Sequence, residues 1–192
     1  MAFGNIINIK HEIAAEGFSI PPFEMKSGEI IIINLQPTKD LYKTENELVC
    51  LLTGKTSRDE IIIFESITFV EHYKQPKWRQ LLYPVTVGEY LRNNANSDSS
   101  FGNKIYELAH ISKRSKIESL SFKDKRFLCL FSALSNTKNI VLDFVGLSFD
   151  TIDTVYEILL EVVRNGGSVI ILDTSRYKES ECSKFIELAW KD

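Results

Sequence analysis

The feature that most constrains the fold is a strand–helix–strand pattern between positions 139 and 172. The segments NIVLDF (139–144) and SVIIL (168–172) are short runs rich in β-branched apolar residues, which is typical of buried strands. Between them, a helical pattern runs from about Asp150 to Gly166 and places its apolar residues on one broad face. Two strands joined by a helix through short connections form a right-handed parallel unit, so the sequence predicts an α/β core.

A second strand–helix pair lies nearer the N-terminus. GEIIII (28–33) predicts a buried strand, and NELVCLLTG (46–54) predicts a helix with Thr44 or Asn46 as its N-cap. The loop between them, NLQPTKDLYKTE (34–45), stands where a phosphate-binding loop would be expected, yet it contains no glycine. Glycines let consecutive backbone N–H groups converge on one phosphate. The strand and the helix that flank such a loop are therefore predicted, but the glycines that would bind a phosphate are missing.

Periodicity and turn residues predict the remaining elements, including Ser121 with Asp124 as a capping-box start. In chain order they are short edge strands up to about Gly28, a strand at 60–71, a helix beginning near Thr86, an exposed polar segment at 93–104, helical structure over 105–134 and a last helix at 178–192.

Composition predicts one compact domain, because 192 residues with 44% hydrophobic and 26% charged side chains can bury a substantial core. A net charge of −3 gives no basic footprint, so nucleic acid is not expected as a partner. Apolar runs are too short to span a bilayer, and the first residues lack a basic flank followed by a long apolar core, so the protein is expected in the cytoplasm. The three cysteines show no metal-ligand spacing and are interpreted as small buried hydrophobes, and two histidines, His11 and His110, as structural groups without a partner carboxylate. The cysteines are Cys50, Cys129 and Cys182.

Several stretches, in one order, resemble the nucleotide-binding domains of ABC (ATP-binding cassette) transporters. LSFKDKRF…ILDTS (120–175) is similar to the signature sequence, the Walker B strand, the D-loop with its helix, and the switch strand. Upstream, GEIIIINL…ELVCLLTG (28–54) is similar to the P-loop strand and helix, and ITFVEHYKQ…LLYPVTVGEYL (67–91) to the Q-loop and the helix after it.

The resemblance implies an α/β fold: an ABC-type P-loop NTPase-like domain with a mostly parallel central sheet, an N-terminal antiparallel β part and a reduced helical subdomain. Residues 1–192 would form this single domain, with 86–118 as the helical insert.

The P-loop positions depart from the family pattern. Asn34 stands at the first glycine position, Thr44 stands before the lysine position, and Glu45 occupies the lysine position itself. A carboxylate there would repel a triphosphate and would remove the main cation that binds it. Only Lys39 or Lys43, in the lengthened loop, could take its place.

The other nucleotide positions implied by the resemblance are altered too. Asp143 matches the magnesium ligand of Walker B, whereas Phe144 stands where the family has a glutamate that polarises water. His72 replaces the Q-loop glutamine, and Thr174 replaces the switch histidine.

The signature keeps only its first two residues. Leu120 and Ser121 match the family, but Phe122, Lys123 and Asp124 replace its two glycines and its glutamine. This surface is therefore not expected to bind the γ-phosphate of a partner's nucleotide.

Three alternatives stay open for single residues. Asp143 is either a magnesium ligand or a carboxylate that hydrogen-bonds the neighbouring loop, and Asp150 is either a D-loop group or a helix N-cap. In the family, the region after the Q-loop and the helical subdomain form the groove for the permease's coupling helix, which makes His72, Trp78 and Tyr83 candidate docking residues. The alternatives are a surface histidine and aromatic side chains that cover the core.

The resemblance and its departures predict a non-hydrolysing pseudo-ATPase subunit that uses neither ATP nor magnesium and holds no metal. It would dock to a membrane permease, an active cassette or both, at the inner face of the membrane, without inserting into the membrane itself. One alternative is a partner-completed ATPase in which Lys39 or Lys43 replaces the missing lysine. Another is a soluble scaffold that reuses the fold, since fold does not determine function.

Overall fold

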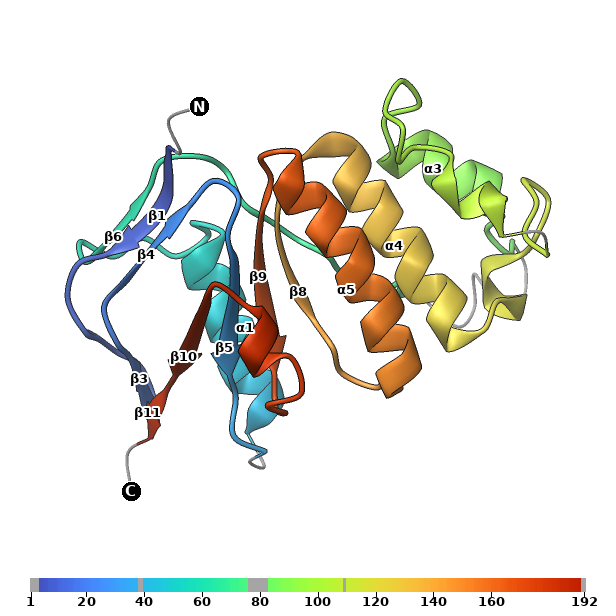
Figure 1. The fold of residues 1–192 in the computed structure, drawn as a ribbon. Coiled ribbons are helices and arrows are strands. Elements are labelled where there is room, and N and C mark those ends of the chain that lie inside the picture. Colours follow the sequence, from blue (N-terminus) through green and yellow to red (C-terminus); the bar gives the residue numbers. More distant parts are fainter. Residues whose placement is uncertain (1–3, 38–39, 76–82, 109, 191–192) are drawn as a thin grey trace. The chain divides into compact units, whose positions relative to one another are not determined.

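The computed structural model describes residues 4–37, 40–75, 83–108 and 110–190. The chain divides into two compact units, one formed by residues up to 69 together with those from 139 onward, and one formed by residues 70–138. Figure 1 shows the elements of both as a ribbon.

A five-stranded parallel sheet forms the centre of the first unit, with the strand order β10-β5-β9-β8-β7. Its inner strands are apolar runs buried on both faces, as the sequence predicted for a covered parallel sheet. The strands are β5 (Ile30–Asn34), β7 (Thr68–Phe69), β8 (Asn139–Asp143), β9 (Ser168–Asp173) and β10 (Lys184–Glu187).

Two helices cover the opposite faces of this sheet (Figure 1). Helix α1 (Leu41–Leu52) buries Leu48 and Leu52 against the face that carries Ile31 and Ile170, in the main apolar cluster of this unit. Helix α5 (Phe149–Arg164) contacts β9 and buries Leu159.

Both helices differ from the predictions at their starts. The N-cap of α1 is Asp40, so the helix begins a turn or more before the predicted caps Thr44 and Asn46. The N-cap of α5 is Ser148, and Asp150 lies in the first turn rather than at the cap. Both helices therefore extend further toward the N-terminus than the sequence predicted.

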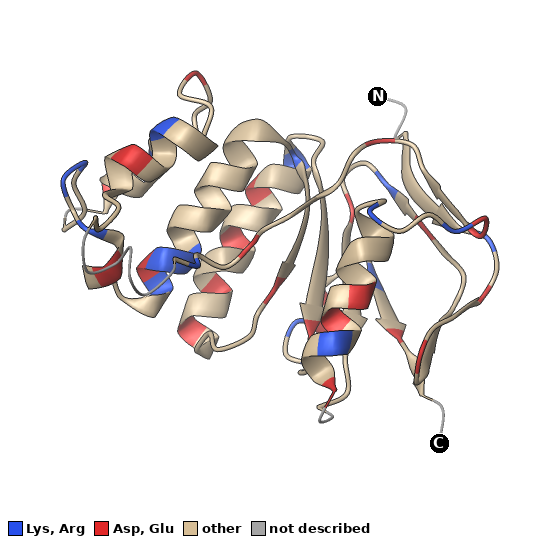
Figure 2. Ribbon diagram, turned by 180° about the vertical axis from the view of Figure 1, so that it is seen from behind, with Lys and Arg blue, Asp and Glu red and all other residues tan. Residues whose placement is uncertain are grey.

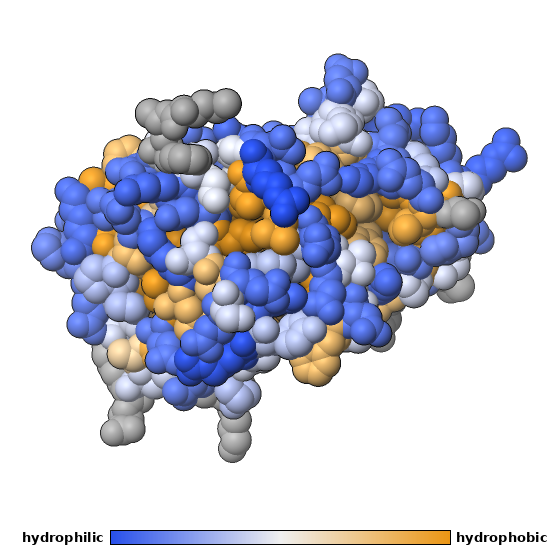
Figure 3. All heavy atoms as spheres, viewed as in Figure 1, coloured by the Kyte–Doolittle hydropathy of each residue, from blue (hydrophilic) through white to orange (hydrophobic). Residues whose placement is uncertain are grey.

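The other strands of the first unit are short and antiparallel, which confirms the predicted N-terminal antiparallel part. One sheet has the order β4-β1-β6 and another the order β11-β3-β2. Their bounds are β1 (Asn5–Ile9), β2 (Ile13–Ala14), β3 (Phe18–Ile20), β4 (Phe23–Lys26), β6 (Ile61–Ile63) and β11 (Ala189–Trp190). On the face drawn in Figure 3, hydrophilic residues surround separate apolar areas.

Two predictions for this unit were wrong. The last segment forms a 3₁₀ turn (Glu179–Glu181), β10 and β11 instead of a helix, because Phe185 and its neighbours pair with β5 at the edge of the sheet. Such pairing overrides a weak helical pattern. The predicted strand at 60–71 divides into β6 and β7, which belong to different sheets.

The second unit contains α3 (Val87–Asn94), two 3₁₀ turns (Lys104–Glu107 and Ile117–Ser119) and α4 (Phe122–Asn136). Thr86 caps α3 by accepting the N–H of Glu89, which confirms the predicted start. The helix predicted over 105–134 is α-helical only from Phe122, since hydrogen bonds between Ser112 and Ser115 form a turn in the polar segment before it. Helix α4 is buried on most sides, as predicted.

The thiols are all free, and the burial prediction holds for one of them: Cys129 is buried, whereas Cys50 and Cys182 are only half-buried. Within the described ranges, no helix has the length and apolar character needed to cross a membrane.

Candidate functional site

Three polar residues end neighbouring strands of the parallel sheet and therefore meet at its carboxyl edge. Asn34 ends β5 opposite Asp173 of β9, and Asp143 ends β8 opposite Leu172. The N–H of Leu35 donates to the carbonyl oxygen of Asp173 at 2.7 Å, which extends this pairing into the loop after β5. This edge is where ligands bind in open α/β sheets.

Asp143 stabilises its own loop. Its side chain is fully buried, and Oδ1 accepts a hydrogen bond from the N–H of Val145 at 2.9 Å. This is the contact with the neighbouring loop that the sequence left as one of two alternatives. The next residue, Phe144, is 3% exposed, so an apolar ring occupies the position after the strand's carboxylate.

Asp173 is a residue that sequence reasoning missed. It is buried at the end of β9, where its Oδ1 accepts the N–H of Thr174 at 2.8 Å and its Oδ2 accepts the hydroxyl of Ser175 at 2.6 Å. An aspartate followed by two hydroxyl residues at a strand end is a local turn signal that could have revealed it. Thr174 is thereby held through its backbone N–H.

The start of α1 places Lys43 and Thr44 in its first turn and Glu45 in the next. Figure 2 shows the charged positions of both signs along the helices and strands. Lys43 Nζ lies 2.7 Å from a carboxylate oxygen of Glu16, and this hydrogen bond lowers the pKa of Glu16 and raises that of Lys43. Both side chains are exposed, so the pair is weak. Thr44 is buried. Lys39 lies outside the described residues.

The buried carboxylate of Asp124 lies in the first turn of α4. Ser121 Oγ accepts the N–H of Asp124 at 3.1 Å and donates to Asp124 Oδ2 at 2.7 Å, while His110 Nε2 lies 3.0 Å from the same oxygen. Burial opposes ionisation of Asp124, but the hydrogen bonds from Ser121 and His110 outweigh it and lower its pKa. The interpretation of His110 as a residue without a partner carboxylate was therefore wrong.

The other three signature positions differ in exposure. Leu120 is buried, whereas Phe122 is half exposed at the first position of α4. The ammonium group of Lys123 lies 5.6 Å from the ring centre of Phe127. The structure thus places polar and bulky side chains where a glycine-rich segment would leave the backbone open.

Of the candidate docking residues, two are described. Tyr83 is 72% exposed, so it does not cover the core, and its carbonyl oxygen accepts a hydrogen bond from Gln75 Nε2 at 3.3 Å. His72 is half-buried, and the ring of Tyr73 beside it packs edge-on against Tyr90 of α3 at 5.8 Å. Trp78 lies outside the described residues.

A buried lysine after β9 was also missed by sequence reasoning. Lys178 is 8% exposed; its Nζ lies 2.9 Å from Asp153 Oδ1 and 2.7 Å from Glu181 Oε1. The same ammonium group lies 5.0 Å from the ring centres of Tyr156 and Tyr177. Lys178 therefore links the segment after β9 to α5.

Compared by sequence, the chain matches no family model and no curated protein. Compared by structure, it resembles many solved chains.

One of them is an ABC transporter of the metal-chelate type in an inward-facing conformation, with a TM-score of 0.71 and 17% identity over 98% of this chain and 84% of that chain. A second is an ABC transporter ATP-binding protein from Pyrococcus furiosus, with a TM-score of 0.69 and 19% identity over 98% of this chain and 100% of that chain. A third is cbiO1 from Clostridium perfringens, part of the ABC transporter complex cbiONQ, with a TM-score of 0.63 and 16% identity over 96% of this chain and 85% of that chain. This chain shares the fold of these three proteins.

Proposed function

We propose that this chain, whose fold is that of the ATP-binding cassettes of ABC transporters, is a non-hydrolysing subunit of such a transporter. It docks to a membrane permease, to an active cassette or to both, as a structural or regulatory component. It acts at the inner face of the membrane through that partner.

The observation that carries the proposal is the position of the Asp124 carboxylate at the start of α4. A helix N-terminus attracts an anion through its N–H groups and its dipole. In this chain Asp124 supplies that anion, held by Ser121 and His110. A phosphate approaching this helix end would meet a negative charge and would have to displace a carboxylate that is already hydrogen-bonded.

The carboxyl edge of the sheet supports the same conclusion. Hydrolysis needs a group beside the nucleotide that polarises water, and the buried ring of Phe144 follows Asp143 at that place. The side chain of Asp143 accepts a hydrogen bond from the N–H of Val145 and thereby stabilises the loop after β8. These two residues give the edge a structural role that needs no nucleotide.

Docking is supported by what the structural relatives assemble with and by the exposed ring of Tyr83. The cassette cbiO1 is part of a transporter complex, and we infer that this chain, which has the same fold, docks to a partner in a comparable complex. Exposed aromatic side chains are frequent anchors in protein interfaces.

Calorimetry with Mg-ATP tests the nucleotide half of the proposal. The purified chain should give no binding isotherm at millimolar nucleotide. Saturable micromolar binding that Asp143→Ala weakens, while the exposed control Asp98→Ala leaves it unchanged, would overturn the pseudo-ATPase assignment.

Photo-crosslinking in the native host tests the docking half. A photoreactive amino acid placed at Tyr83 should crosslink to a membrane protein, whereas the same group at the exposed Phe64 should not. A crosslink to a soluble protein alone would favour the scaffold reading of the same fold.

One observation favours the alternative of a partner-completed ATPase. Because α1 begins at Leu41, Lys43 and Thr44 stand in its first turn, where a P-loop carries its lysine and hydroxyl residue. Lys43 would only have to leave its exposed contact with Glu16, which costs little. ATP turnover that Lys43→Ala abolishes and the exposed control Lys55→Ala preserves would establish this alternative.

A further inference from the structure

The second unit contains a pocket of about 500 Å³ between α3 and the segments that follow it. This volume lies in the range of small-molecule sites in proteins. The lining residues are Thr86, Gly88, Glu89, Leu91, Arg92, Ala95, Ser97, Gly102, Asn103, Tyr106 and Lys113. None of them belongs to the ends of the parallel strands or to the starts of α1 and α4.

One wall is fixed by close backbone contacts between α3 and the segment 113–116. The N–H of Gly88 donates to the carbonyl oxygen of Lys113 at 3.0 Å, and the N–H of Val87 donates to that of Ser115 at 2.9 Å. A Cβ atom on Gly88 would lie 2.9 Å from the same Lys113 oxygen, so only glycine allows this approach.

A second wall is fixed to α4. The N–H of Asn96 donates to Ser135 Oγ at 2.9 Å, and Ser132 Oγ donates to the carbonyl oxygen of Asn94 at 3.0 Å. At Gly102 an added Cβ would lie 2.2 Å from the carbonyl oxygen of Asn96, which again requires glycine. Both walls are therefore held by backbone contacts, so the pocket is formed before any ligand enters.

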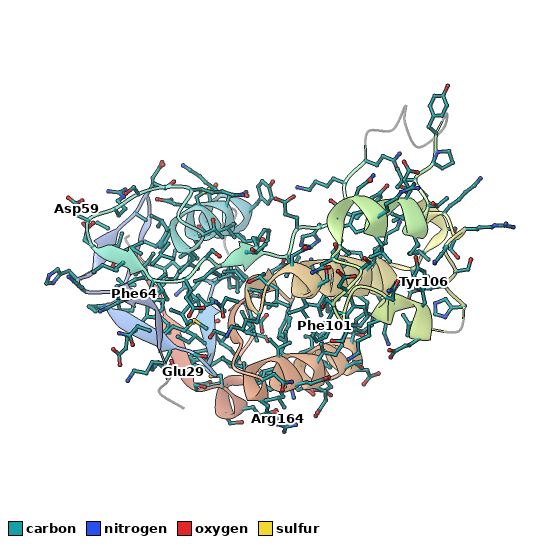
Figure 4. The ribbon with its side chains drawn as sticks, turned by 90° about the horizontal axis from the view of Figure 1, so that it is seen from above. Glu29, Asp59, Phe64, Phe101, Tyr106 and Arg164 are labelled. Atoms are coloured by element: carbon teal, nitrogen blue, oxygen red, sulfur yellow. The ribbon has the colours of Figure 1, made fainter. Side chains whose placement is uncertain are left out.

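The charges in the pocket are of both signs. Glu89 and Arg92 lie three residues apart on α3, and Lys113 comes from the facing segment. Among the described residues, the structure records no ion pair for any of these three side chains. Tyr106, labelled in Figure 4, adds a half-buried hydroxyl-bearing ring, and Leu91 with Ala95 adds apolar surface.

We propose that this pocket binds a small zwitterion of the amino-acid class. The anionic group of the ligand pairs with Arg92 and Lys113, and its cationic group pairs with Glu89. A ligand with both charges pairs with all three side chains, whereas a simple anion would be repelled by the Glu89 carboxylate beside it. The apolar part of the ligand contacts Leu91 and Ala95. The site would make the second unit respond to a metabolite, independently of any nucleotide.

The test uses ¹H–¹⁵N spectra of the labelled full chain with each of the twenty proteinogenic amino acids, and with succinate and putrescine as single-sign probes. At least one amino acid should shift the amide signals of Gly88 and Gly102 saturably, and neither single-sign probe should match its affinity. Arg92→Ala and Glu89→Gln should each weaken that binding at least tenfold. The exposed controls Arg164→Ala and Glu107→Gln should leave it unchanged.

Two results would overturn the inference. One is the absence of saturable shifts with all twenty amino acids. The other is succinate binding as tight as that of the best amino acid, with no effect of Glu89→Gln, which would make the pocket a plain anion site. Neither result bears on Mg-ATP binding or on the crosslink at Tyr83, so this inference and the proposed function fail separately.

Discussion

Asp124 and His110 meet at the start of α4, with Asp124 Oδ2 3.0 Å from His110 Nε2. The two residues are 14 positions apart, and the second belongs to a turn rather than to the helix that it contacts. The same carboxylate oxygen accepts the hydroxyl of Ser121. One buried carboxylate therefore joins the helix start to the preceding segment and fills the place where a helix attracts an anion.

Replacing this carboxylate should lower stability in a pH-dependent way. We expect Asp124→Asn to lower the free energy of unfolding by roughly 1–2 kcal/mol at pH 7, the usual value for a charge-assisted hydrogen bond at a helix cap. Because the pKa of Asp124 is lowered in the folded protein, its stabilisation is present above the ordinary carboxyl pKa and is lost as the pH falls through the folded value.

Urea unfolding at several pH values measures this effect. The difference between the native protein and Asp124→Asn should shrink as the pH falls below about 4. Asp150→Asn, at an exposed position in the first turn of α5, should change stability little at any pH. A difference for Asp124→Asn that stays constant down to pH 2 would contradict the contribution of the charge.

The central sheet was predictable because its strands carry a strong local signal. Strands β5, β8 and β9 are buried on both faces, so their residues are apolar except at the strand ends, and the helix between β8 and β9 fixes their parallel direction. The edge strand β10 has no such signal: its four residues are only partly buried or exposed, and pairing with β5 decides its structure. Tertiary contacts thus determine what the local pattern leaves ambiguous.

The candidate site was predictable only at the level of residue types. Sequence order located Asp143, Phe144 and Thr174 at strand ends. The partner of Asp124 could not be inferred, since the polar segment that brings His110 to α4 has no periodic pattern. The same holds for Lys178, whose contact with Asp153 joins residues on separate elements.

The buried Lys178 should contribute measurably to the stability of the first unit. Lys178→Met keeps most of the apolar stem but removes the ammonium group from Asp153, Glu181 and the two tyrosine rings. We expect a loss of roughly 1–2 kcal/mol, because a desolvated cation over aromatic rings is worth more than an exposed ion pair. Thermal unfolding measures it, with Lys55→Met as the exposed control. Equal melting temperatures for the two variants would show that the contacts of Lys178 add nothing.

The thiols should react in an order set by burial. Burial raises the pKa of Cys129 and of Cys182, and Cys129 is the more deeply buried of the two. Since the thiolate is the reactive form, Cys129 should resist iodoacetamide in the native state and react only after unfolding. Cys50 and Cys182, which are half-buried, should react before it. Mass spectrometry of peptides from a timed reaction gives the order, and early modification of Cys129 would contradict the packing around α4.

A single substitution should not restore the water-polarising carboxylate of an active cassette. Phe144 is 3% exposed, so Phe144→Glu would remove a buried ring and place a carboxylate in an apolar site. We expect a loss of at least about 3 kcal/mol, from the known cost of truncating buried phenylalanines and of burying a charge. The next residue provides the matched control, because Val145 is 45% exposed and Val145→Glu should cost little.

Urea unfolding of the two variants and a phosphate-release assay with Mg-ATP together measure the outcome. If Phe144→Glu folds with native stability and hydrolyses ATP, the remaining phosphate contacts are intact and the chain is one residue from an active ATPase. If it unfolds readily and releases no phosphate while Val145→Glu stays stable, the strand end has been repacked around the ring. In that case the absence of ATP hydrolysis follows from the packing of the Phe144 ring in the core.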